Sequence, residues 1–210
     1  MSQKNYCFPR SGFIKYLIGR LWMFIFGWKI EGTVPQGSKF IIIGAPHTTN
    51  WDLPFGLALL HVLRLRFSWI GKDSLFKGPF GFFMRALGGI PVKRSSPQGV
   101  VKQIVTQFKT QDKFALVIAP SGTRKKRDCW KSGFYWIANT AQVPLVCGYA
   151  DYKRKAAGLG LCFMPSGDIK KDMDKIRAFY QDIRGKHPER ESTIRLKDEQ
   201  SLCQKVKRLT

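Results

Sequence analysis

Short apolar runs alternate along this chain with longer amphipathic stretches. The run 39–44, which is apolar after Lys39, and the uninterrupted apolar run 114–119 are typical of strands that are covered on both faces of a sheet. Residues 97–111, in contrast, place their apolar side chains on one face at helical spacing. Strands that alternate with helices predict a single α/β domain, in which helices flank a central, mostly parallel or mixed sheet.

The same patterns predict the remaining elements and the limits of the domain. We expect further helices at 13–30, 53–63, 79–87, 132–141 and 171–185, and further strands at 66–70, 90–94, 144–149 and 161–164. We therefore divide the chain into an N-terminal membrane-interfacial helix at 1–34, an α/β domain at 35–186 and a charged, solvated C-terminal tail at 187–210.

The stretch 13–30 is strongly apolar but is interrupted by cations. Its longest uncharged run, 21–28, is far shorter than the roughly 20 apolar residues that span a bilayer, and no small-x-small cleavage site follows it. Trp22 and Trp28, with cations beside them, favour a helix that lies in the headgroup region of a membrane. The alternative is an ordinary helix packed on the domain.

Charge narrows the range of partners. The chain has 36 Lys and Arg against 14 Asp and Glu, a net charge of +22, and the cations are spread over both halves. Such a surface attracts nucleic acid, anionic membranes, acidic proteins or phosphorylated ligands. Most aromatic residues fall in apolar runs rather than among cations, which disfavours a nucleic-acid surface. The five scattered cysteines and three histidines lack metal-ligand spacing, so we expect no metal site, no disulfide framework and a reducing compartment.

His47 and Asp52 are the first candidates for chemistry. They lie where strand 39–44 ends and helix 53–63 begins, a place where α/β enzymes often position reactive groups. A carboxylate in the first turn of a helix is favoured by the helix dipole, and it could hold the imidazole in one tautomer with the other nitrogen free as a base. The alternative is that Asp52 only starts the helix and its spacing from His47 is chance.

Two later loops add hydrogen-bond donors and positive charge. One contains Lys72 and leads to Arg94, and the other, 120–124, follows the run 114–119 directly. In this second loop, Gly122 permits a tight turn and the planar guanidinium of Arg124 suits bidentate phosphate binding. Alone, the second loop could equally be a basic surface turn.

Together these loops resemble the conserved blocks of the lysophospholipid acyltransferases, the 1-acylglycerol-3-phosphate acyltransferase superfamily. The resemblance covers about residues 40–150. The four blocks, in order, are His-x-x-x-x-Asp at 47–52, Gly71 to Arg94, Pro-Ser-Gly-Thr-Arg at 120–124 and Val-Pro-Leu-Val at 143–146.

The resemblance implies transfer of a fatty acyl group from acyl-CoA or acyl carrier protein to a hydroxyl of a lysophospholipid or related glycerolipid. It implies that His47 is the general base, that Asp52 orients it, and that the hydroxyl attacks the thioester without an acyl-enzyme. The loop around Lys72 would help to stabilise the oxyanion. The substrate-binding residues that it implies are Lys72, Arg94, Ser121, Gly122, Thr123 and Arg124. No cofactor beyond the thioester co-substrate is implied.

The resemblance also implies partners and a location. We expect an anionic membrane surface, a lysolipid acceptor and a thioester donor, possibly bound to acyl carrier protein, and no nucleic acid. The protein is expected to be membrane-associated at the cytoplasmic face.

One position departs from the family pattern. Ser121 stands where the third block usually has glutamate, which predicts an acceptor other than plain lysophosphatidic acid. The alternatives are a basic nucleic-acid- or membrane-binding protein without catalysis and a catalytically silent, lipid-binding relative.

Overall fold

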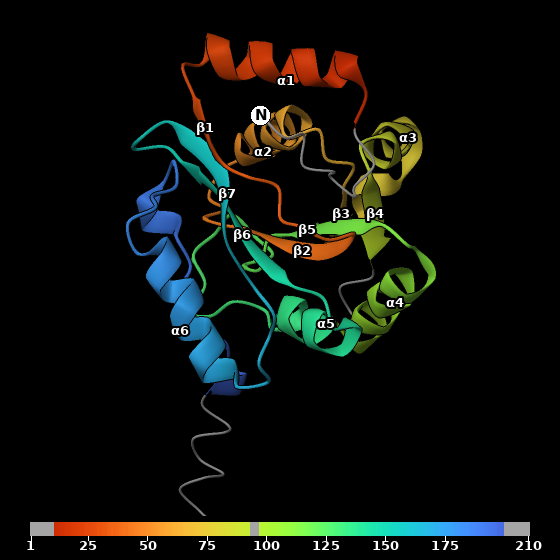
Figure 1. The fold of residues 1–210 in the computed structure, drawn as a ribbon, viewed down its shortest axis with the longest axis vertical. Coiled ribbons are helices and arrows are strands. Elements are labelled where there is room, and N and C mark those ends of the chain that lie inside the picture. The colour runs from red at the N-terminus through yellow and green to blue at the C-terminus, as the bar shows by residue number, and fades with distance from the viewer. Residues whose placement is uncertain (1–10, 93–96, 200–210) are drawn as a thin grey trace, which may run out of the picture.

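A single mixed sheet of seven strands forms the centre of the described structure. The computed structural model describes residues 11–92 and 97–199 (Figure 1). The strand order is β1-β7-β6-β2-β5-β3-β4, and neighbouring strands are parallel except for the antiparallel pair β6 and β7. The strands are β1 (Lys29–Gly32), β2 (Lys39–Gly44), β3 (Ser68–Lys72), β4 (Gly89–Val92), β5 (Phe114–Ile118), β6 (Leu145–Asp151) and β7 (Ala156–Phe163).

Helices cover both faces of this sheet. They are α1 (Phe13–Ile25), α2 (Asp52–Val62), α3 (Gly78–Ala86), α4 (Pro97–Thr110), α5 (Gly133–Ala141) and α6 (Ile169–Tyr180), with short 3₁₀ helices at Asp73–Phe76 and Pro188–Arg190. Figure 1 shows α4, α5 and α6 on one side of the sheet, and α2 on the other side with α1 lying across it. The predicted α/β domain with a mixed sheet flanked by helices is confirmed.

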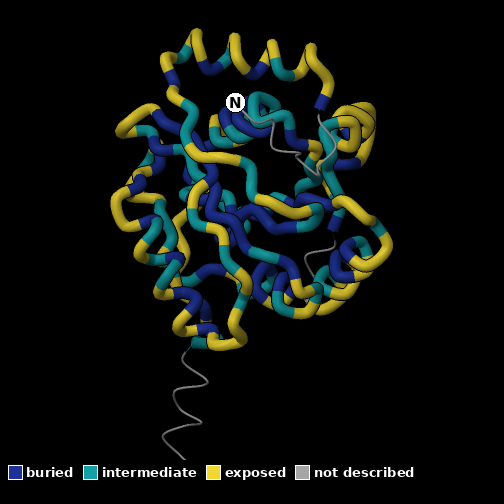
Figure 2. Tube along the Cα trace, viewed as in Figure 1, coloured by how far each residue is buried: buried dark blue, intermediate teal, exposed yellow. Residues whose placement is uncertain are grey.

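The central strands are buried on both faces, as their apolar runs predict. In β2, Ile41 and Ile43 join the core beneath α4, α5 and α6, whereas Phe40 and Ile42 join the core beneath α2. Successive side chains of a strand point to opposite faces, so a strand between two helical layers has to be apolar throughout. Figure 2 shows this buried centre surrounded by exposed loops and outer helix faces.

Three central strands end at one edge of the sheet. In the parallel register, Ile43 of β2 lies opposite Ile118 of β5 and Cys147 of β6. The Tyr180 hydroxyl, at the end of α6, lies 2.9 Å from the carbonyl oxygen of Ile43 and 3.0 Å from that of Gly148. The loops that leave β2 and β5 therefore emerge together, which is where ligands bind in open α/β sheets.

The N-terminal helix is shorter than predicted, and its tryptophans do not face outward. Gly27, with φ of +66°, follows the end of α1, after which β1 joins the edge of the sheet. Trp28 is buried and stacks on Phe55 of α2 at 4.1 Å between ring centroids, and Trp22 also packs against Phe55. The expected helix over 13–30 with headgroup-facing tryptophans is therefore wrong. Within residues 11–92 and 97–199, no helix is long and apolar enough to cross a membrane.

The described part of the expected tail, 187–199, packs on the domain rather than standing in solvent. Leu196 is buried in the core beneath α6, and the Trp130 amide donates a hydrogen bond to the Arg195 carbonyl at 2.8 Å. Charged residues dominate this segment, so the few apolar contacts and backbone pairings that hold it are not visible as a periodic pattern. Helix α6 also ends at Tyr180, five residues earlier than predicted.

Asp172 links α6 to α5 and to the loop before α6, and it gives a test of the fold. Burial raises the pKa of this carboxyl, but hydrogen bonds from the Ser166 amide, the Lys175 ammonium and the Tyr135 hydroxyl outweigh burial, so its pKa lies below the ordinary value. A lowered pKa in the folded state means that the stabilisation is present at neutral pH and is lost as the pH falls through the carboxyl range.

We expect Asp172→Ala to lower the free energy of unfolding by about 2–4 kcal/mol at pH 7, because it leaves buried donors without an acceptor. The difference from wild type should shrink as the pH falls below about 4, where the ordinary carboxyl is protonated. Urea denaturation at both pH values measures this. Asp174→Ala, on the exposed side of the same helix, is the control and should cost less than about 1 kcal/mol; equal losses for the two variants would contradict the assignment.

Candidate active site

The carboxylate of Asp52 accepts four hydrogen bonds. Oδ2 accepts from the backbone amides of Thr48 and Thr49, at 2.8 and 3.0 Å, and from Nδ1 of His47 at 3.0 Å. Oδ1 accepts from the hydroxyl of Tyr152 at 2.9 Å. Asp52 is the first residue of α2, as its place in the sequence predicts, so the helix dipole also favours its negative charge. The carboxylate thus fixes the whole loop between β2 and α2.

This arrangement sets the tautomer of His47. An ionised carboxylate can only accept, so the proton on the His47 ring lies on Nδ1, and Nε2 presents a lone pair. The ring is only partly buried, with 24% of its side chain exposed. His47 therefore has one nitrogen anchored and the other able to accept a proton from a group beside the loop.

Tyr152 is a contact of Asp52 that the sequence does not reveal. It lies in the turn between β6 and β7, a hundred residues from Asp52, and it also packs edge-on against Trp28. Burial, together with the neighbouring Asp52 charge, raises the pKa of Tyr152 well above its ordinary value. The phenol therefore remains protonated and remains a donor at physiological pH. No local pattern around Tyr152 distinguishes it from an ordinary turn residue.

The loop after β5 brings the third predicted block to the same edge of the sheet. Ser121 is buried and its hydroxyl donates to the Thr123 carbonyl at 2.9 Å, while Gly122 has φ of +63° and makes the tight turn expected of it. Arg124 is exposed. A Cβ on Gly122 would lie 3.2 Å from Cε of Lys131, so this lysine, which lies outside the four sequence blocks, is against the turn.

The second block is only partly described. Lys72 is the last residue of β3 and is exposed, and the register of β3 with β5 places it at the edge where the loops after β2 and β5 emerge. Strand order puts β5 between β3 and β2, so Lys72 lies about two strand spacings, roughly 10 Å, from the line of β2. Arg94 lies outside the described residues.

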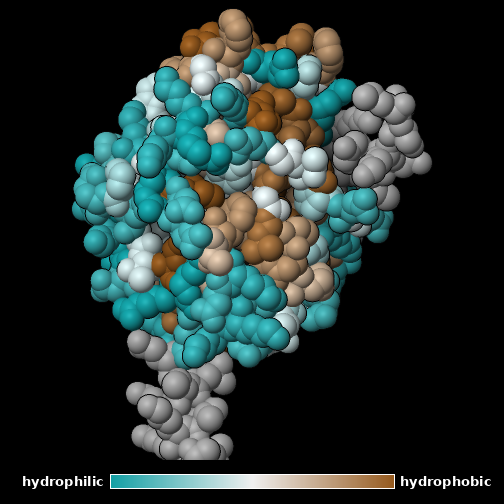
Figure 3. Space-filling view, turned by 60° about the vertical axis from the view of Figure 1, so that its left-hand side comes forward, coloured by the Kyte–Doolittle hydropathy of each residue, from teal (hydrophilic) through white to brown (hydrophobic). Residues whose placement is uncertain are grey.

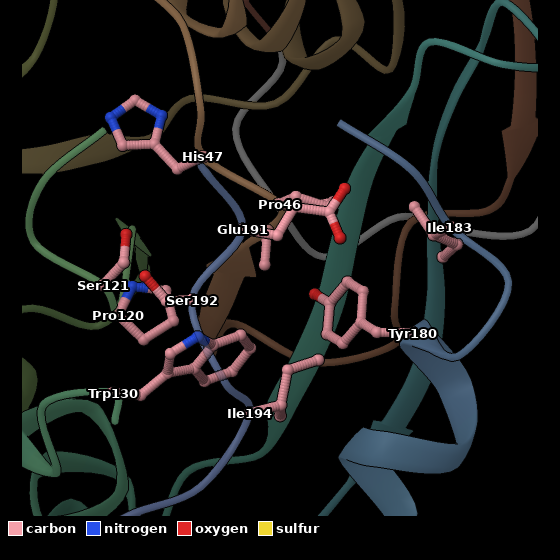
Figure 4. Close-up of a pocket in the computed structure, with 11 residues that line it drawn as sticks. Pro46, His47, Pro120, Ser121, Trp130, Tyr180, Ile183, Glu191, Ser192 and Ile194 are labelled. Carbon is pink, nitrogen blue, oxygen red and sulfur yellow. The ribbon is translucent and has the colours of Figure 1, made fainter. Parts of the chain in front are cut away.

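A small cavity opens between these loops and the segment after α6 (Figure 4). Its volume is about 40 Å³. Its lining residues are Ala45, Pro46, His47, Pro120, Ser121, Trp130, Tyr180, Ile183, Glu191, Ser192 and Ile194. The cavity therefore joins the first and third blocks to a part of the chain that the sequence patterns assign to no site. Within residues 11–92 and 97–199, no three His, Cys, Asp or Glu side chains are grouped to hold a metal ion.

The fold and the paired loops define an α/β domain with a candidate active site at one edge of its sheet, and the comparison with protein families gives the class. The family model described as Acyltransferase matches residues 28–149, more than half of the chain, so this protein belongs to the acyltransferase family. No significant match was found among the sequences of curated proteins.

A solved structure agrees with the fold. The crystal structure of the 1-acyl-sn-glycerophosphate acyltransferase PlsC from Thermotoga maritima is similar, with a TM-score of 0.53 and 18% sequence identity. The likeness covers 78% of this chain and 75% of that chain. Tyr152, Tyr180 and Glu191 all lie beyond the region that the family model matches.

Proposed function

We propose that this acyltransferase moves a fatty acyl group from a thioester, acyl-CoA or acyl carrier protein, to a hydroxyl of a lysophospholipid or related glycerolipid. The observation that supports this most directly is the His47–Asp52 pair, with Nδ1 of the imidazole 3.0 Å from the carboxylate and the ring beside a cavity. The similar structure from Thermotoga maritima is a 1-acyl-sn-glycerophosphate acyltransferase, which supports a glycerolipid acceptor.

The proposed reaction uses His47 twice. Nε2 takes the proton of the acceptor hydroxyl while the hydroxyl oxygen attacks the thioester carbonyl carbon, and the carbonyl π electrons move to the oxygen. When the tetrahedral intermediate collapses, the carbon–sulfur bond breaks and the thiolate takes the proton back from Nε2. The products are an ester and a free thiol. Asp52 stabilises the imidazolium that forms between the two steps, because its carboxylate faces Nδ1–H.

Cations of the second and third blocks are suited to the phosphates of the substrates. We assign Arg124 and Arg94 to the acceptor phosphate and the loop around Lys72 to the developing oxyanion, with Ser121, Gly122 and Thr123 shaping the turn that presents Arg124. Lys131 is added to this set because it lies against Gly122. Both acyl-CoA and acyl carrier protein carry negative charge, so the net charge of +22 favours either donor.

We propose that the protein acts at a membrane surface. One face of α1 packs on α2, where Gly19 allows close approach to Ala58, but the opposite face is apolar and exposed. Its exposed residues are Phe13, Ile14, Leu17, Ile18, Leu21, Phe24 and Ile25. Figure 3 shows hydrophobic side chains along the top of the molecule, where α1 lies. An exposed apolar face of this kind beside cations suits binding to anionic lipid at the cytoplasmic face.

Three predictions test this proposed function, and the first concerns the base. His47→Ala should lower the rate of acyl transfer from acyl-CoA or acyl carrier protein to a lysolipid by about 10²–10⁴-fold, because the acceptor hydroxyl loses its proton acceptor. Product formation with radiolabelled thioester measures this, and flotation with anionic vesicles should show unchanged binding. Unaltered transfer by His47→Ala would exclude His47 as the base. If wild type is retained on heparin but transfers no acyl group, the result would favour a basic binding protein without catalysis.

The second prediction concerns Tyr152. Tyr152→Phe removes one donor from the Asp52 carboxylate and should lower kcat about tenfold with KM for both substrates little changed. Tyr149→Phe is the matched control, since the Tyr149 hydroxyl also donates to a carboxylate, that of Glu31, on the outer strands of the sheet. Equal effects of the two variants on kcat would mean that Tyr152 supports only the fold.

The third prediction concerns the exposed face of α1. Leu21→Asp combined with Phe24→Asp should weaken binding to phosphatidylglycerol vesicles more than tenfold, because each apolar side chain contributes about 1.5–3 kcal/mol on burial. The thermal midpoint should hardly change, since both side chains point away from the domain. Met164→Asp alters an exposed apolar residue elsewhere and should bind normally; equal binding by all variants would contradict membrane docking through α1.

A further inference from the structure

The segment after α6 connects the two loops that form the cavity. On one side, the His187 amide donates to Oγ1 of Thr48 at 3.2 Å, next to His47. On the other side, the Arg127 amide donates to Oγ of Ser192 at 3.1 Å, and the Thr193 amide donates to the Arg127 carbonyl at 3.0 Å. This segment therefore forms a wall of the cavity and is not a loose tail. It lies outside the region that the family model matches.

Glu191 puts a carboxylate into this wall. Its Oε1 accepts a hydrogen bond from the Gly185 amide at 2.7 Å, which holds the segment in a closed loop. None of the ion pairs among the described residues includes Glu191. Glu191 therefore adds a carboxylate to the cavity that His47 also lines, in a chain with 36 Lys and Arg against 14 Asp and Glu. It retains acceptor capacity and negative charge that a ligand can use.

The carboxylate limits which ligand groups the cavity favours. A hydroxyl and an ammonium group both donate hydrogen bonds to a carboxylate. The charge of a terminal phosphate, in contrast, is repelled by Glu191.

We propose, on the basis of the proposed acyl transfer to a lysolipid, that Glu191 is a specificity-determining residue for the acceptor. It favours lysophospholipids whose phosphodiester ends in a hydroxyl or an ammonium group, and it disfavours phosphomonoester acceptors. The phosphodiester itself stays near the exposed Arg124, and the terminal donor enters the cavity. Discrimination thus combines attraction of one headgroup with repulsion of the other.

The test compares three acceptors: lysophosphatidylethanolamine, lysophosphatidylglycerol and lysophosphatidic acid. Glu191→Gln keeps an oxygen for the Gly185 amide but removes the charge. We expect the ratio of kcat/KM for lysophosphatidic acid over lysophosphatidylethanolamine to rise about five- to tenfold in this variant. If Glu191→Gln lowers kcat/KM more for lysophosphatidylethanolamine than for lysophosphatidylglycerol, an ammonium is the preferred donor. Equal losses of kcat/KM for these two acceptors identify hydrogen bonding alone.

Glu189→Gln is the matched control, because Glu189 lies two residues away on the same segment with 67% of its side chain exposed and does not line the cavity. It should leave the ratio unchanged. An unchanged ratio in Glu191→Gln, or the same shift in both variants, would overturn the proposal.

A binding measurement separates this inference from the proposed reaction. Calorimetric titration with hexanoyl versions of the three lysolipids, below their micelle concentrations, gives dissociation constants without turnover. Wild type could acylate none of the three lysolipids and still bind the phosphodiesters more tightly. If Glu191→Gln, but not Glu189→Gln, abolishes this binding preference, the assignment of Glu191 stands and the proposed reaction fails. If the binding preference is absent in wild type, the assignment of Glu191 fails whatever the activity.

Discussion

The carboxylate of Asp52 fixes the geometry on which the rest of the site depends. Two backbone amides, an imidazole and a phenol converge on its two oxygens, so the loop between β2 and α2 has one arrangement that satisfies all four donors. Because the same carboxylate starts α2, the orientation of the His47 ring is coupled to the position of a helix that is itself packed on the sheet. A side chain that must hold a reactive nitrogen in place gains rigidity from this coupling.

The antiparallel pair of β6 and β7 has a consequence for this site. Reversal after β6 places the connecting turn at the edge where β2 also ends, and Tyr152 in that turn then reaches Asp52. Had β7 followed through a crossover helix, the chain would have left this edge, and the second oxygen of Asp52 would have needed another donor. The mixed sheet thus contributes directly to the site as well as to the core.

Sequence patterns predict the parts of this protein whose cause is local. The apolar run of β2, the amphipathic repeat of α4 and the motif loops follow from short-range chemistry, and their positions agree with the structure. The four-residue β1 has no strand pattern of its own, because Lys29 and Ile30 continue the apolar stretch of the expected helix 13–30, and only pairing with β7 makes Lys29–Gly32 a strand. Tyr152 and Glu191 have no local signature either, because the residues that give them importance, Asp52 for Tyr152 and the other cavity-lining residues for Glu191, are distant in sequence.

The charge distribution explains why one carboxylate can matter so much here. Over most of this surface, cations outnumber acids, so an anionic ligand is attracted almost wherever it lands, and attraction alone distinguishes poorly between phosphorylated lipids. Selectivity among these lipids then has to come from a group whose charge opposes the positive potential of the surface. Glu191 is such an element, because it lies in the wall of a small cavity beside His47 and is held there by the Gly185 amide. A broadly positive surface can therefore attract phosphorylated lipids in general, while one carboxylate in the wall of the cavity discriminates among their headgroups.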